Sequence, residues 1–109
     1  MNAIDPIDRA VADFEALAVQ WAQEDGEARK LEKMKKIIFS ELVNQSNETS
    51  VAKAEHWARD HRRYRELVEQ VIGARTVANI TKAKLDAKEM RFEAWRTAQA
   101  TRRAEMNLR

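Results

Sequence analysis

Two glycines and one proline are the only strong helix-breaking residues in this 109-residue chain. With so little turn chemistry, and with Ala, Glu, Lys, Arg, Gln and Leu abundant, the sequence favours long helices and gives little support to a sheet. Its length suits one domain with a thin core. We therefore predict an all-α protein in which residues 1–109 form a single domain.

The first predicted helix spans about residues 6–43. Asp5 suits the N-cap and Pro6 suits the first helical position. Gly26 weakens the helix at about 1 kcal/mol relative to alanine, yet the apolar stripe keeps its phase across it, so we expect one continuous helix. The stripe consists of Ile7, Val11, Phe14, Leu17, Ala18, Trp21, Ala28, Leu31, Met34, Ile38 and Leu42.

A polar cluster at residues 44–50 lacks apolar periodicity and predicts the loop of a hairpin. From about residue 51 to residue 108 no residue demands an end to the second helix. Gly73, beside small Ala74 and Ala78, is expected where the two helices approach most closely. An apolar seam repeats every seven residues at Trp57, Tyr64, Val71, Ala78, Leu85 and Phe92, with Leu67, Ala74, Thr81 and Trp95 in the companion position. The predicted fold is a long antiparallel, coiled-coil-like helical hairpin.

The two predicted helices differ in length, at roughly 57 Å and 88 Å for a rise of 1.5 Å per residue. In a simple antiparallel register Pro6 falls beside Lys88, which leaves residues 89–109 without an intramolecular partner. Isolated helical segments are marginal in water, so a second copy, another partner or a fold-back of the tail itself should cover this overhang. We predict a homo-oligomer. The residues expected at the oligomer or partner contact are Leu85, Phe92, Trp95, Met106 and Leu108.

Charge is distributed unevenly between the halves of the chain. Residues 1–50 carry a net charge of −4 and residues 51–109 a net charge of +6. This asymmetry is consistent with an acidic helix lying against a basic one, or with a basic arm that contacts nucleic acid. In the second interpretation Trp95 or Phe92 stacks on a base while cations contact phosphates. The candidate nucleic-acid-binding residues are Lys84, Lys88, Arg91, Arg96, Arg102 and Arg103.

A plainer interpretation treats these cations as an ordinary solvated helix surface. Several of them have acidic neighbours at helical spacing, which favours local ion pairs over ligand binding. The expected pairs are Lys82 with Asp86, Glu93 with Arg96, and Arg102 with Glu105.

The sequence offers little for catalysis or for metal binding. It contains no cysteine, no glycine-rich phosphate loop and no His-Glu metal motif, so we expect a non-enzyme without a cofactor. His56 and Asp60 can share a helical face, but His61 diverges from them, which argues against a metal site. Residues 1–8 do not read as a signal peptide and no apolar run is long enough to span a membrane, so we expect a cytoplasmic protein with no membrane partner.

Five segments carry a resemblance to a known group of proteins: residues 74–79 (ARTVAN), 82–85 (KAKL), 90–97 (MRFEAWRT), 100–106 (ATRRAEM) and, more loosely, 64–69 (YRELVE). They resemble short helical proteins of bacteriophages and prophages, which are usually uncharacterised. The resemblance implies a place among early phage genes for recombination or replication. It supplies no catalytic or binding residues.

Together these features give a first hypothesis of a non-catalytic, phage-type accessory protein that binds single-stranded or double-stranded DNA in recombination or replication, in the host cytoplasm. The alternative is a protein-interaction module, acting as scaffold, adaptor or inhibitor of another phage or host protein through its overhanging C-terminal helix. A virion structural component is a third hypothesis. The salt dependence of binding separates the first two, because DNA binding releases counterions.

Overall fold

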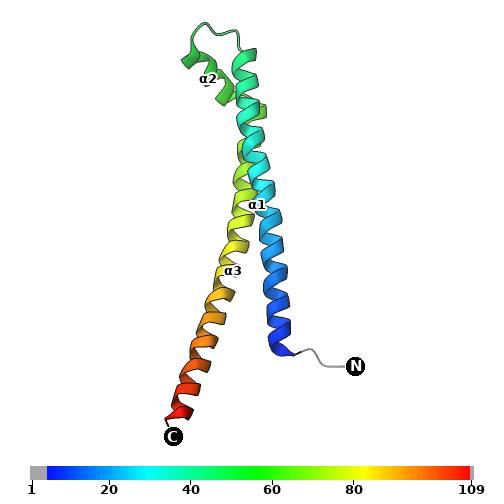
Figure 1. The fold of residues 1–109 in the computed structure, drawn as a ribbon. Helices are drawn as coiled ribbons and strands as arrows, with labels where there is room; N and C mark the ends of the chain where they lie inside the picture. Colours follow the sequence, from blue (N-terminus) through cyan, green and yellow to red (C-terminus); the bar gives the residue numbers. More distant parts are fainter. Residues whose placement is uncertain (1–4, 109) are drawn as a thin grey trace, which may run out of the picture.

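The computed structural model describes residues 5–108, which form three helices (Figure 1). Helix α1 runs from Pro6 to Gln45, the short helix α2 from Val51 to Asp60, and helix α3 from Arg62 to Asn107. Helices α1 and α3 lie antiparallel along an elongated molecule of 83 × 38 × 14 Å, and α2 lies beside the closed end of the pair. The all-α class and the elongated hairpin shape predicted from the sequence are confirmed.

Helix α1 begins and ends as its capping residues dictate. The Asp5 carboxylate accepts a hydrogen bond of 2.7 Å from the backbone N–H of Ile7, and Pro6 occupies the first turn. At the other end Ser46 adopts an extended backbone, and its N–H donates to the carbonyls of Leu42 and Val43. Gly26 lies within the helix without a break. The prediction of one continuous first helix is therefore correct.

The second predicted helix is interrupted, which corrects the expectation of an unbroken helix from residue 51 to residue 108. Ser50 caps α2, since its hydroxyl accepts from the N–H of Lys53 at 3.2 Å. At His61 the backbone becomes extended, with φ −67° and ψ 136°, and the ring nitrogen Nδ1 accepts from the N–H of Arg63 at 3.1 Å. An ion pair of 3.3 Å between Arg65 and Asp60 spans the break. The His61 side chain thus caps α3, while its extended backbone ends α2.

The break displaces the register of the hairpin. In the register expected from the sequence, Phe14 would face Ile80; instead its ring packs edge-on against Phe92, with the ring centroids 5.7 Å apart. The 10 residues of α2 form the corner and shift α3 along α1. The expected overhang is consequently shorter. Phe92 is half-buried against α1. In this register Pro6 lies level with about Ala100, so only the last turns of α3 extend past α1, with Arg109 outside the described residues.

The apolar core lies at the closed end, where all three helices meet. Its buried members are Ile38, Leu42, Ala58 and Leu67, with Leu31, Phe39, Val43 and Tyr64 packed around them. Trp57, predicted in the seam, is 38% exposed because it sits on α2, outside the α1–α3 contact. Its indole lies against the ring of His61 at the corner. The seam prediction is therefore wrong at this position.

The middle of the hairpin is held by polar contacts. Arg75 on α3 donates to Asp25 at 2.6 Å and to Glu32 at 3.0 Å, both on α1. The Thr81 hydroxyl donates to the Glu24 carboxylate, and farther along Arg63 pairs with Glu41 at 3.6 Å. Each pair joins an acidic residue of α1 to a residue of α3. An acidic helix does lie against a basic one, as the charge asymmetry suggested.

The closest approach of α1 and α3 does not involve Gly73. Ala28 and Ala78 are fully buried between the helices, next to the Arg75 and Thr81 contacts. Gly73 instead lies on the outer face of α3, where a Cβ atom would meet no atom within 4 Å. The expectation is therefore wrong for Gly73, whereas Ala78, named beside it, does lie in the close approach.

Candidate binding groove at the open end of the hairpin

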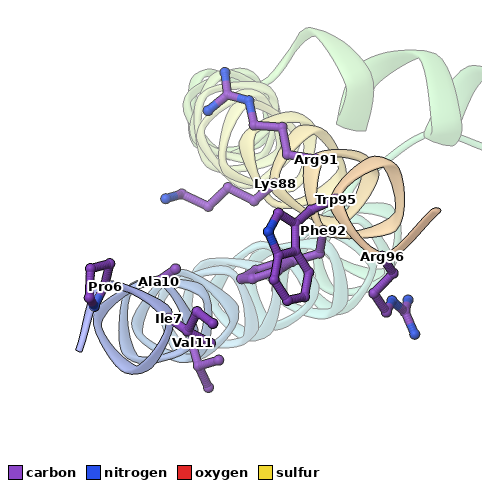
Figure 2. A pocket seen from close by; sticks show the side chains of 9 residues that line it. All are labelled: Pro6, Ile7, Ala10, Val11, Lys88, Arg91, Phe92, Trp95 and Arg96. Atoms are coloured by element: carbon purple, nitrogen blue, oxygen red, sulfur yellow. The ribbon is translucent and has the colours of Figure 1, made fainter. Parts of the chain in front are cut away.

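Helices α1 and α3 diverge toward the ends of the described chain, and a groove of about 520 Å³ lies between them (Figures 1 and 2). The inner end of the groove is closed by the contact between Phe14 and Phe92. The outer end is open to solvent. The lining comes from the first turns of α1, with Pro6, Ile7, Ala10 and Val11, and from α3, with Lys88, Arg91, Phe92, Trp95 and Arg96.

The floor of the groove is apolar and incompletely covered. Ile7 is 51% exposed, Val11 is 43% exposed and Trp95 is 47% exposed. Figure 2 shows the indole of Trp95 reaching over the groove toward α1, with Phe92 beside it. Because the α1 stripe and the α3 seam separate here, the residues that would have sealed the two-helix interface remain open. An aromatic face and two aliphatic side chains are thus available to a ligand.

Three cations line the edges of this floor. Lys88, Arg91 and Arg96 project from α3 around Trp95, with Arg91 directed away from the floor (Figure 2). Within residues 5–108 none of the three forms an ion pair with a carboxylate. The expected pair of Glu93 with Arg96 is not formed, whereas the expected pair of Lys82 with Asp86 is, at 3.2 Å. The groove therefore combines an apolar floor with cationic charge that the described chain does not neutralise.

Two other cations of α3, Lys82 and Arg75, contact residues of α1. Lys82 also lies over the Trp21 ring, 4.9 Å from its centroid, and so serves the hairpin itself. Arg75 holds the pKa of Asp25 below its ordinary value through their hydrogen bond, and Asp25 and Glu32 in turn raise the pKa of Arg75. These cations stabilise the α1–α3 contact. The groove cations are distinguished from them by having no such role.

The structure brings together only part of the predicted site. Lys88, Arg91, Phe92, Trp95 and Arg96 meet in the groove. The remaining predicted residues lie outside it. Leu85 is 7% exposed and packs within the hairpin, so it is not available to a partner, which corrects that prediction. Lys84, Arg102, Arg103, Met106 and Leu108 are exposed, the last four on the segment of α3 that extends beyond the groove.

Sequence reasoning missed the contribution of α1. Ile7 and Val11 belong to the stripe that was expected to be covered by α3. Their exposure depends on the angle between the helices, which no local sequence signal reports.

Residues 5–108 contain no group of three or more His, Cys, Asp or Glu side chains placed to hold a metal ion. His56 pairs with Asp60 at 3.4 Å on the exposed side of α2, as their spacing predicted. Among the described helices, none has a segment both long enough and apolar enough to cross a bilayer.

Comparisons with protein-family models, with curated proteins and with solved structures gave no match for this chain. The function proposed below is therefore inferred from the geometry and charge of the groove.

Proposed function

We propose that this protein is a non-catalytic nucleic-acid-binding protein that holds single-stranded DNA in the groove at the open end of the hairpin. The observation that carries the proposal is the half-exposed Trp95 indole flanked by Lys88 and Arg96, neither of which is paired within the described chain. Single-strand binders combine an aromatic platform with a cationic track in this way.

The groove favours a single strand over a duplex. An unpaired base can leave its neighbours and stack on Trp95, whereas the bases of a duplex stay stacked inside it and offer mainly phosphates. The phosphates on either side of the stacked base would be contacted by Lys88 and Arg96. Arg102 and Arg103, one to two turns farther along α3, would extend the phosphate track beyond the groove, with Lys84 and Arg91 adding to the surrounding positive potential.

A role as an accessory in DNA recombination or replication, in the cytoplasm of a phage host, follows from the resemblance of residues 74–106 to phage proteins. In that setting a small helical protein coats or hands over a single strand and performs no bond chemistry. Affinity for DNA should then be modest and strongly dependent on salt.

A second candidate is favoured by one observation. Ile7 and Val11 give the groove more aliphatic surface than a base requires. An amphipathic helix with acidic residues beside its apolar face would cover both the floor and the cationic rim. In that alternative the protein is an adaptor or inhibitor of another protein.

The test measures fluorescence anisotropy of a labelled 20-nucleotide single strand, and of the matching duplex, at several salt concentrations. Trp95→Ala should weaken single-strand binding by about 1 to 3 kcal/mol, or roughly 5-fold to 150-fold. The matched control is Trp57→Ala, because Trp57 is also partly exposed but lies at the closed end. Equal losses in the two variants, or no binding to the wild-type protein at low salt, would contradict the proposal.

The cations supply a second readout. Replacing Lys88 and Arg96 together by alanine should lower the slope of log affinity against log salt by about 0.7 for each phosphate that the protein no longer neutralises. Lys36→Ala, an exposed cation on α1, should leave the slope unchanged. A peptide of acidic amphipathic character that displaces the DNA with a shallow salt slope would instead favour the adaptor role.

A further inference from the structure

Helix α3 carries a second apolar face, which is exposed and lies away from α1. Its large members are Ile72, Val77, Ile80 and Met90, which are 61%, 51%, 53% and 69% exposed. At about 100° per residue, Ile80 lies roughly opposite Ala78 and Leu85, the residues buried against α1. The helix is thus apolar on two sides, although the hairpin needs only one.

The face is continuous over about 27 Å of helix, from Ile72 to Met90. The positions between the large residues include the small residues Gly73, Ala83 and Ala87, all exposed, and Lys84, a charged residue about 40° around the helix from Ile80. Thr76 adds no unsatisfied polar group, because its hydroxyl donates to the Ile72 carbonyl at 2.8 Å. A strip of this length is larger than the isolated exposed apolar residues usual on a soluble surface, and such strips mark interaction sites.

We propose that this outer face of α3 is the interface of an antiparallel homodimer, in which the outer face of a second copy covers it. A two-fold axis between Ile80 and Ala83 would place Ile80 of each chain near Ala83 of the other, and Thr76 near Ala87. Large side chains then meet small ones, as helix packing requires.

The charged residues at the ends of the strip favour a second copy of this chain as the partner, packed in the antiparallel direction. Glu69 and Arg91 flank the two ends of the strip, and within the described chain neither forms an ion pair. On this axis Glu69 of each chain lies three residues, about 4.5 Å along the helix, from the position opposite Arg91 of the other, a gap that the long arginine side chain spans, so two ion pairs form. A parallel arrangement would instead oppose Glu69 to Glu69 and Arg91 to Arg91, which is repulsive.

Gly73 fits the same arrangement. It disfavours the helix relative to alanine, and nothing in the described chain uses the space left by its missing Cβ. On the outer face that space lets the Met90 side chain of a second copy lie close to the α3 backbone. Gly73, which has no packing role within one chain, thus makes room for the second chain in the dimer.

The interface leaves the groove free. Phe92 and Trp95 project toward α1, whereas Arg91 points away from the groove floor (Figure 2). Arg91 borders both sites, whereas Trp95, Lys88 and Arg96 lie outside the dimer interface. The dimer therefore goes beyond the proposed DNA binding and is tested separately from it.

Sedimentation equilibrium of the full chain between 1 and about 200 µM tests the proposal, with a dimer expected at the upper concentrations. Ile80→Lys places two like charges at the axis and should raise the dimer dissociation constant at least about tenfold. The matched control is Val19→Lys, since Val19 is 58% exposed but lies on α1. It should dimerise as the wild-type chain does. Circular dichroism at 222 nm confirms that each variant remains helical.

Charge exchange gives the stricter test. Glu69→Arg and Arg91→Glu should each weaken the dimer by about threefold to tenfold, and the double variant should recover wild-type affinity. A wild-type monomer at 200 µM would overturn the proposal. A dimer that tolerates Ile80→Lys would overturn it as well, because the interface would then lie elsewhere.

Discussion

Replacing Leu42 by alanine tests whether the closed end supplies most of the stability of the hairpin. Leu42 is 1% exposed and is the largest fully buried side chain among the described residues. The substitution removes three carbon atoms, worth about 2.4 kcal/mol at roughly 0.8 kcal/mol each. The cavity left between Ile38, Ala58 and Leu67 adds to this, so we expect a loss of about 3 kcal/mol. For a chain of this size that corresponds to about 15 °C in melting temperature.

The assay is urea unfolding at one fixed protein concentration, followed by circular dichroism at 222 nm. Ile37→Ala is the matched control, because it removes the same number of carbons from a side chain that is 57% exposed. It should cost less than about 1 kcal/mol. If Leu42→Ala cost no more than this control, the closed end would not be the main source of stability and the reasoning would be refuted.

Two further predictions concern the middle of the hairpin. The pKa of Asp25 lies below its ordinary value of 3.8, so the unfolded chain binds a proton more readily than the folded one, and the stabilisation is complete above about pH 4 and lost as the pH falls through the lower, folded value. Asp25→Asn should remove this part of the acid dependence in urea unfolding between pH 2 and about pH 6. Gly26→Ala should raise the unfolding free energy by up to about 1 kcal/mol, because the new methyl group meets no atom within 4 Å. An unchanged acid profile, or a destabilised Gly26→Ala, would contradict these expectations.

Local signals predicted the helices well. Asp5 and Pro6 located the start of α1, Ser50 located the start of α2, and the predicted end near residue 43 lies two residues from Gln45. Capping groups and apolar periodicity act over one or two turns, so a sequence reports them directly. The continuity of α1 across Gly26 followed for the same reason.

The break at His61 could not be predicted in this way. Its cap uses a ring nitrogen, and histidine is not among the residues favoured at an N-cap, so the periodic pattern from Trp57 to Tyr64 concealed it. The contacts that depend on the register of α3 against α1 therefore differ from those expected. Phe92 packs against Phe14, and Trp57 lies outside the seam. The groove lies where the sequence predicted an uncovered overhang.

The sequence predicted the α3 side of the candidate groove but not its α1 side. Trp95 and its neighbouring cations were identified from residue type and spacing, since both are properties of one helix. The contribution of Ile7 and Val11 depends on how two helices diverge, and the outer strip around Ile80 depends on which side of α3 the hairpin uses. Both are tertiary facts, because an apolar residue at helical spacing has the same signal whether it is covered or exposed.

The hairpin places the first turn of α1 and the last turn of α3 at the same end of the molecule (Figure 1). A fluorophore or surface anchor attached to the first turn of α1 would therefore stand beside the groove and obstruct it. The connection between α1 and α2, at residues 46–50, lies at the opposite end of a molecule that extends over 83 Å. A label or anchor inserted there would leave the groove facing the solution, which makes this connection the attachment point of choice for immobilised binding measurements.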